Sequence, residues 1–216
     1  MTKGFLRGLL LLAGLCLTTG APLAFAQDTA APQPDHQYLD TDRIATMPEF
    51  IGPGSHRKQR ELDQLLKYDP QNVRARVQSG LAMVARGLRD RAYQEFNYAV
   101  QVAPPNSAAL RHAHWGFGWG ALRAGDYPKA VSEWQLAQQG YDGHASWVPW
   151  TMAIGLWAKG DRDLAIAYWE SAVRSNANRW ASTRGLDKEM ADWQPEERNI
   201  ATELHAEWKH RLSNRN

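Results

Sequence analysis

Small and aromatic residues recur at helical spacing in three segments of the chain. Each segment has glycine, alanine, an aromatic residue and alanine at the same internal spacing: Gly87-x4-Ala92-x3-Phe96-x2-Ala99, Gly125-x4-Ala130-x3-Trp134-x2-Ala137 and Gly160-x4-Ala165-x3-Trp169-x2-Ala172. Residues at i, i+4 and i+7 share one face of a helix, so each triplet after the glycine forms a single stripe. The glycine stands where a preceding helix ends and the chain reverses. This pattern predicts an array of helical hairpins.

The repeat also sets the helix boundaries that we expect. The three hairpins should have helices near residues 73–86 and 90–102, 107–123 and 127–139, and 145–159 and 162–175. The alanines let a neighbouring helix approach closely, and the aromatic side chain fills the space between the helices. The sequence therefore predicts an all-α fold.

These units resemble the tetratricopeptide repeat (TPR), a helix–turn–helix of 34 residues with a Trp-x2-Leu-Gly-x2-Tyr, Ala-x3-Phe, Ala and Pro pattern. The small position of the first helix is occupied by Gly80, Gly118 and Ala153, and Pro104 closes the first unit. The early Trp and Leu of the family pattern are poorly matched. The resemblance covers roughly residues 73–176.

The resemblance implies a right-handed solenoid of about three TPR-like repeats with capping helices at both ends. The units recur after 38 and then 35 residues. The first spacing exceeds the family period by about one helical turn, so we expect an extra turn in the helix that begins near Ser107. We assign the repeat domain to residues 57–180 and the C-terminal capping helices to residues 181–216.

Further apolar stripes flank the repeats. The segment 57–67 carries three leucines on one side and is expected to form a helix that caps the N-terminal end. After the third unit, residues 186–193 are expected to form a short helix, and Pro195 suits the first position of a final helix. The final helix has an apolar stripe that the third hairpin should cover: Ile200, Leu204, Trp208 and Leu212.

The first 26 residues are typical of a cleavable signal peptide. Lys3 and Arg7 precede a short apolar run, and a small-x-small cleavage site ends at Ala26. The apolar run is too short for a good membrane span. Cys16, the chain's one cysteine, follows Leu15 rather than the small residue that lipidation needs. We expect a periplasmic or secreted protein that begins at Gln27, without thiol chemistry or an integral membrane span.

Charge changes the list of expected partners. Cleavage removes two of the 25 basic side chains and leaves 23 to balance 23 acidic ones. A neutral chain is not drawn electrostatically to nucleic acid or to an anionic membrane. Residues 27–56, rich in Pro, Asp, Gly and Gln, are expected to be an extended or disordered lead-in.

All ten tryptophans lie between Trp115 and Trp208. In TPR proteins the first helices line a concave groove that binds partners. The residues that the alignment places there are His112, Trp115, Trp119, Trp147, Trp150 and Trp157. Exposed aromatic side chains favour binding interfaces. Two alternatives stay open beside a misalignment: these rings form a partner-binding groove, or the C-terminal helix lies in the groove and buries them.

The sequence shows no pattern typical of an active site. The run Gly116–Ala121 fits G-x-G-x-x-G/A, but it lies within a predicted helix rather than between a strand and a helix, so the match is accidental. His112 and His114 stand two apart, and His205 and His210 five apart, on different faces of their helices. We therefore expect no enzyme activity, no metal and no cofactor.

The resemblance implies an adaptor that binds a protein or peptide in the cell envelope. Relatives of this architecture serve envelope assembly, cell-wall machinery, secretion or energy transducers of the Tol/TonB kind. The alternative is a carbohydrate- or peptidoglycan-binding module that stacks sugars on tryptophan faces.

Overall fold

The computed structural model describes residues 34, 37–44 and 55–215, all within one unit that comprises residues 31–216. The expected signal peptide and most of the lead-in lie outside the described residues. The described helices are α1 (His56–Tyr68), α2 (Val73–Val84), α3 (Arg89–Val102), α4 (Ala108–Arg123), α5 (Tyr127–Gln139), α6 (Val148–Lys159), α7 (Arg162–Ser175), α8 (Ala177–Trp180), α9 (Thr183–Glu189) and α10 (Pro195–Ser213). The described part contains no β-strand beyond an isolated bridge, so the all-α prediction is confirmed.

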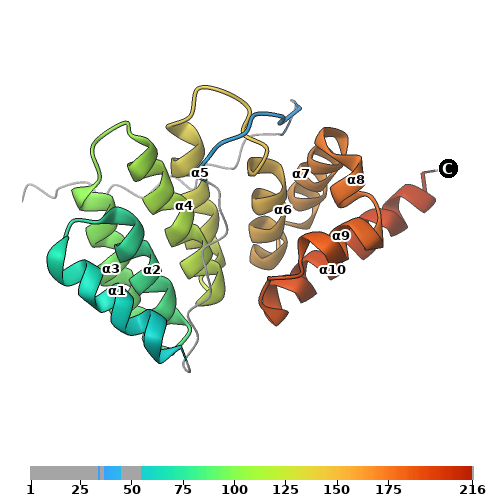
Figure 1. Ribbon diagram of the computed structural model, residues 1–216. Coiled ribbons are helices and arrows are strands. Elements are labelled where there is room, and N and C mark those ends of the chain that lie inside the picture. Colours follow the sequence, from blue (N-terminus) through green and yellow to red (C-terminus); the bar gives the residue numbers. More distant parts are fainter. Residues whose placement is uncertain (1–33, 35–36, 45–54, 216) are drawn as a thin grey trace, which may run out of the picture. The chain divides into compact units, whose positions relative to one another are not determined.

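Helices pair along the chain as α2–α3, α4–α5 and α6–α7 (Figure 1). Their bounds lie within three residues of the predicted ones at every end. Helix α4 has 16 residues, whereas α2 and α6 have 12 each, which confirms the extra turn expected after Ser107. Ser107 caps this helix, because its hydroxyl accepts a hydrogen bond from the Leu110 amide at 3.1 Å.

The three glycines of the repeat end the first helix of each hairpin in the left-handed conformation. Their φ angles are +73° at Gly87 and Gly125 and +96° at Gly160. In each turn the amide after the glycine donates to the carbonyl five residues back, at 2.9–3.0 Å: Leu88 to Met83, Asp126 to Ala121 and Asp161 to Leu156. This is the Schellman arrangement, which satisfies terminal carbonyls and favours glycine at this position.

The aromatic residue of a second helix is held between glycines of two first helices, one from its own hairpin and one from the next. The sets are Gly80 and Gly120 around Phe96, and Gly118 and Gly155 around Trp134. A Cβ atom built at any of these glycines collides with the ring that it faces. The glycines within Gly116–Ala121 therefore serve helix packing in the interior of α4, as expected.

The ends of the array are covered differently. At the N-terminal end, α1 packs against α2 and buries Leu62 beside Ala75 and Ala82. At the other end, Trp169 contacts the rings of Trp180 and His205, with centroids 5.5 and 6.2 Å away.

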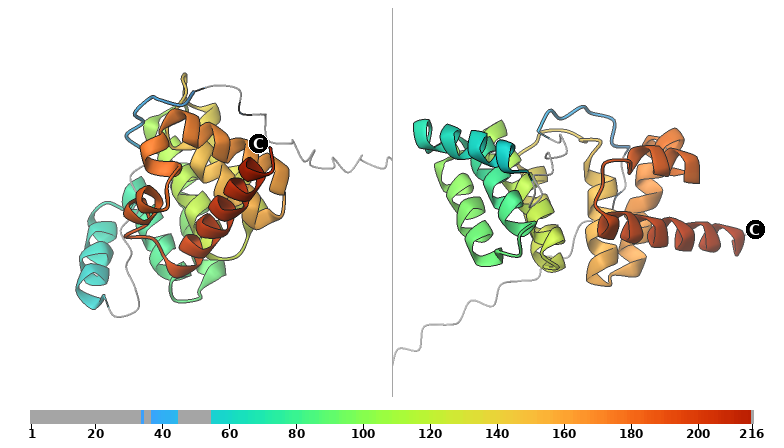
Figure 2. Two further views of the ribbon diagram at one scale, coloured as in Figure 1. Left: turned by 90° about the vertical axis from the view of Figure 1, so that its right-hand side faces the viewer. Right: turned by 60° about the horizontal axis from the view of Figure 1, so that its bottom comes forward.

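Helix α10 lies against α6 and α7 (Figure 2). Its predicted apolar stripe is buried at Leu204 and Trp208, while Leu212 is 37% exposed. The short helix expected at 186–193 is found earlier, as α9, and Pro195 begins α10 as predicted. None of the described helices combines the length and apolar composition that a bilayer crossing requires.

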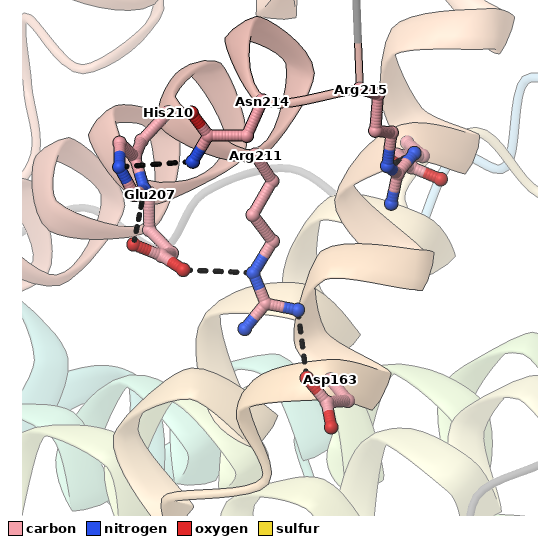
Figure 3. A network of polar contacts seen from close by, with 7 residues as sticks. Asp163, Glu207, His210, Arg211, Asn214 and Arg215 are labelled. Atoms are coloured by element: carbon pink, nitrogen blue, oxygen red, sulfur yellow. Dashed lines mark hydrogen bonds and ion pairs between the residues drawn. The ribbon is translucent and has the colours of Figure 1, made fainter.

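A charged network joins the C-terminal half of α10, and Arg215 just after it, to α7 (Figure 3). Arg211 donates to Glu207 at 2.8 Å and to Asp163 at 2.7 Å, and Arg215 donates to Glu170 at 2.8 Å. The Asp163 side chain is 91% exposed. Exposed ion pairs are screened by solvent and stabilise little, so the network orients α10 while burial supplies most of its stabilisation.

Candidate functional site

The six residues predicted to line a groove are all buried. Trp115 and Trp119 have no exposed surface, and the other four, His112, Trp147, Trp150 and Trp157, are 3–8% exposed. None of these rings presents an open face to solvent. Burial of these rings is expected only in the alternative in which the C-terminal helix lies in the groove.

Seven tryptophans form one continuous network of ring contacts, with neighbouring centroids 5.2–6.0 Å apart. Its members are Trp115, Trp119, Trp134, Trp150, Trp169, Trp180 and Trp193. Trp180 of α8 and Trp193, which precedes α10, both stack on Trp150. The covering rings therefore come from the segment between α7 and α10 rather than from the final helix alone.

This network lies between α4 and α6, where successive hairpins pack less closely than the first two do. Helices α2 and α4 are in close backbone contact, whereas α4 and α6 meet chiefly through side chains, among them Trp119 and Trp150 at 5.8 Å. Four indole N–H groups, those of Trp115, Trp119, Trp157 and Trp169, have no hydrogen-bond partner within the described structure. The faces of neighbouring rings, as in the edge-to-face contact of Trp119 with Trp134, are only weak hydrogen-bond acceptors for such N–H groups.

A segment of the lead-in, residues 37–44, lies against the helical hairpins, and we call it the strap; it is extended as far as Asp42 and ends in a turn at residues 43 and 44. It is the short blue segment in Figure 1, beside the loop between α5 and α6. The Asp40 amide donates to His144 O at 3.0 Å, and the Ser146 amide donates to Asp40 O at 2.9 Å. These two bonds form the isolated parallel bridge. One of the two forms expected for the lead-in, the extended one, is thus present at the strap.

A buried ion pair holds the centre of the strap. Arg111 of α4 donates to both carboxylate oxygens of Asp42, at 2.5 and 3.1 Å, and the Trp147 indole N–H donates to the same carboxylate at 3.1 Å. The Asp42 side chain is 3% exposed and that of Arg111 is 12% exposed. The Arg111 guanidinium also lies 4.7 Å from the centre of the Tyr141 ring. A bidentate, charge-assisted pair of this kind selects a carboxylate by geometry as well as by charge.

Apolar anchors hold both ends of the strap. Tyr38 and Ile44 are 5% and 2% exposed, and the Tyr38 amide donates to the Ser175 hydroxyl at 2.9 Å. His112 Nδ1 lies 3.1 Å from Ile44 O, and because a carbonyl can only accept, Nδ1 carries the proton. Burial lowers the pKa of His112, which keeps the ring neutral in the folded protein.

Two of the six predicted groove residues, His112 and Trp147, therefore donate hydrogen bonds to the strap. The other four belong to the core beneath. Arg111 and the strap itself were not predicted as parts of the site. The available signal was the alternation Tyr38-x-Asp40-x-Asp42, which places three residues on one side of an extended chain.

A second concave region lies between the ends of α2 and α4 and the start of α10. Its volume is about 350 Å³. The lining is largely apolar and includes Val84, Leu122 and Ile200 together with Arg123 and Glu197. Arg123 Nε donates to Glu197 at 2.6 Å, and the Gln194 amide donates to the same carboxylate at 2.8 Å. Both charges are thus already satisfied within the protein.

Other polar clusters of the described part have structural partners. His114 Nδ1 lies 2.7 Å from the buried Glu133, and Lys129 lies 2.5 Å from the same carboxylate. In the described residues no three His, Cys, Asp or Glu side chains are grouped so as to hold a metal ion.

No family model matches the chain, and neither a curated protein nor a solved structure matches it. Functional interpretation therefore depends on the geometry of this chain. The strap contacts form a surface, made by α4, the α5–α6 loop and α7, that binds an extended backbone and one carboxylate.

Proposed function

We propose that this chain is a TPR-like adaptor that binds an extended segment of another protein in the cell envelope. The binding surface is the one formed by α4, the α5–α6 loop and α7. Export through a signal peptide cleaved after Ala26 accounts for the envelope location. The protein acts by bringing partners together within assembly, secretion or Tol/TonB-type machinery, without chemistry of its own.

Three repeated structural details support the TPR-like part of the proposal. Each hairpin ends its first helix at a left-handed glycine, and each carries the same alanine–aromatic–alanine stripe. Glycines of successive hairpins hold Phe96 and Trp134 in equivalent positions. Such stacking of similar units is the architecture from which solenoid proteins build binding surfaces.

The strap is the single observation that carries the binding function. It supplies backbone pairing at Asp40, a carboxylate for Arg111 and apolar anchors at its ends. Extended peptides bind to proteins through this combination of main-chain hydrogen bonds and alternate side chains. A tryptophan face for sugar stacking has less support, since all ten indole rings are buried.

Site-specific photo-crosslinking in the exported, full-length protein tests the proposal. A photoreactive residue in place of His144, beside the strap, should crosslink to a defined envelope protein. The same residue in place of Leu136, 41% exposed in α5, is the matched control and should not. Retention on cell-wall sacculi without any protein crosslink would instead favour the glycan-binding alternative and contradict the adaptor.

A further inference from the structure

The strap binds to the helices as a peptide ligand binds to a receptor. Its even-numbered residues, 38, 40, 42 and 44, make the contacts with the helices and the α5–α6 loop, and three of them, Tyr38, Asp42 and Ile44, are buried, whereas Asp40 and the odd-numbered residues 39, 41 and 43 are exposed. Leu39, for example, is 62% exposed. From Tyr38 to Asp42 the alternation follows from the two-residue period of an extended chain, and a turn at residues 43 and 44 brings Ile44 to the same side. Recognition therefore depends on four side chains at alternate positions and on one stretch of backbone.

The chemistry of the four positions is specific. The first holds a buried aromatic ring, and the third holds a carboxylate with three side-chain N–H donors at 2.5–3.1 Å. At the second position the Asp40 carboxylate accepts from the His144 amide at 2.6 Å, and at the fourth a buried aliphatic residue accepts a hydrogen bond from His112 through its backbone carbonyl. A peptide that presents aromatic, acidic, acidic and aliphatic residues at alternate positions satisfies every one of these contacts.

The tryptophan network beneath the strap is covered largely by other parts of the chain. Trp119 and Trp150 are covered by Trp193, and Trp150 by Trp180 as well, none of which belongs to the strap. Departure of the strap would uncover the polar edges of His112 and Trp147 and the Arg111 guanidinium, which water can solvate, together with the apolar surface that Tyr38 and Ile44 cover. The tryptophan network keeps its own cover.

We propose that the strap is an internal ligand that occupies the partner site, and that a partner segment with the pattern aromatic-x-Asp/Glu-x-Asp/Glu-x-aliphatic displaces it. This inference rests on the proposed adaptor function and specifies the partner's chemistry. Because the strap is tethered, it competes at an effective concentration on the order of millimolar. The strap therefore occupies the site until a partner segment binds to it more tightly, or until another contact holds that segment close to the site.

Peptide binding to the full mature chain tests this inference. The probe is a fluorescent, end-capped peptide of residues 37–44, followed by anisotropy. Asp42→Asn in the protein weakens the internal strap, so this variant should bind the wild-type peptide at least about tenfold more tightly than the wild-type protein does. The peptide with the same Asp42→Asn change should bind the variant at least about tenfold more weakly than the wild-type peptide. Leu39→Ser is the matched control in both molecules and should change neither affinity.

A folded variant that binds no peptide overturns the inference. If Asp42→Asn protein is not helical by circular dichroism, Ile44→Ser replaces it as the weakened strap, with the same expected gain in peptide affinity. Should both variants stay folded and bind no peptide, the strap is a fixed part of the core. If the photo-crosslink to an envelope protein is still observed in that case, the proposed adaptor function stands. The two proposals can therefore be contradicted independently of each other.

Discussion

At the scale of single residues, the glycines of α4 determine how closely the helices approach. Gly118 faces Trp134, whose indole N–H donates to Trp115 O at 3.1 Å. Neither the ring nor the backbone can move freely, because the ring is fixed by this bond and by its contact with Trp119. Close packing here depends on the absence of a single methyl group.

Gly118→Ala should therefore lower the free energy of unfolding by about 1–3 kcal/mol, as overpacking does elsewhere, despite the better helix propensity of alanine. Urea unfolding measures the loss. The control is the same change in a Trp134→Phe background, where the smaller ring should reduce the cost. Equal losses in the two backgrounds would show that the ring is not the obstacle.

His112 should make stability depend on pH. Burial lowers its pKa, and the nearby positive charge of Arg74 acts in the same direction, while the hydrogen bond to Ile44 O opposes them. The unfolded chain, with a histidine pKa of about 6.5, then binds protons more readily than the folded one. Stability is full above that pH and falls as the pH is lowered toward the folded value.

His112→Asn retains a side-chain donor but does not titrate. Between about pH 7 and pH 5 we expect the free energy of unfolding to fall less in this variant than in the wild type. His205, whose pKa is also lowered by burial, stays in both proteins and cancels from the comparison. Unfolding curves at several pH values give the measurement, and parallel pH profiles would contradict the assignment.

At the scale of elements, the alanine stripe defines the close faces of the second helices. Ala130 in α5 and Ala165 in α7 have no exposed surface. Replacement by leucine, Ala130→Leu or Ala165→Leu, should cost about 1–3 kcal/mol each. Ala167→Leu, at a half-buried position of the same helix α7, is the control and should cost less. If thermal unfolding shows all three variants unchanged, these alanines do not lie at close helix contacts.

The helical elements could be predicted because their determinants are local. The glycine that ends each first helix and the i, i+4, i+7 stripe act within one or two helical turns, and both occur three times. The one large boundary difference is at α6, which begins at Val148 rather than 145. There, backbone pairing between residues 144–146 and Asp40 holds the chain extended, and that contact joins residues more than 100 positions apart.

At the scale of the whole described unit, the tryptophans form a core rather than an open surface. Trp119→Ala and Trp150→Ala should each lower stability by about 3–5 kcal/mol, as for other large buried aromatic residues. The control is Leu136→Ala, a large exposed side chain of α5, which should cost little. Thermal stability close to wild type in both tryptophan variants would mean that the rings line an accessible groove.

The candidate site could be predicted only in part. Alignment of the repeats placed Trp119 and Trp150 on neighbouring first helices, and their rings lie 5.8 Å apart, because this placement follows from helix register. What covers that region depends on long-range contacts of the strap, Trp180 and Trp193, and no local pattern specifies them. The sequence left open whether the groove is free for a partner or filled by the C-terminal helix, and the rings that cover Trp150 come from Trp180 and Trp193, which precede α10.

The central claim is that the partner surface binds an extended segment and is occupied by the strap. Hydrogen exchange of the chain, measured by mass spectrometry, tests this claim most directly. The amides of Tyr38 and Asp40 donate to Ser175 and His144, so peptides covering 37–44 should exchange more slowly than an unstructured chain. They should also exchange faster than α4 and α6, because the strap opens without unfolding the hairpins. Arg111→Gln should abolish the protection of residues 37–44 and leave that of the helices intact. Exchange of 37–44 at the unstructured rate in the wild-type protein would contradict the account.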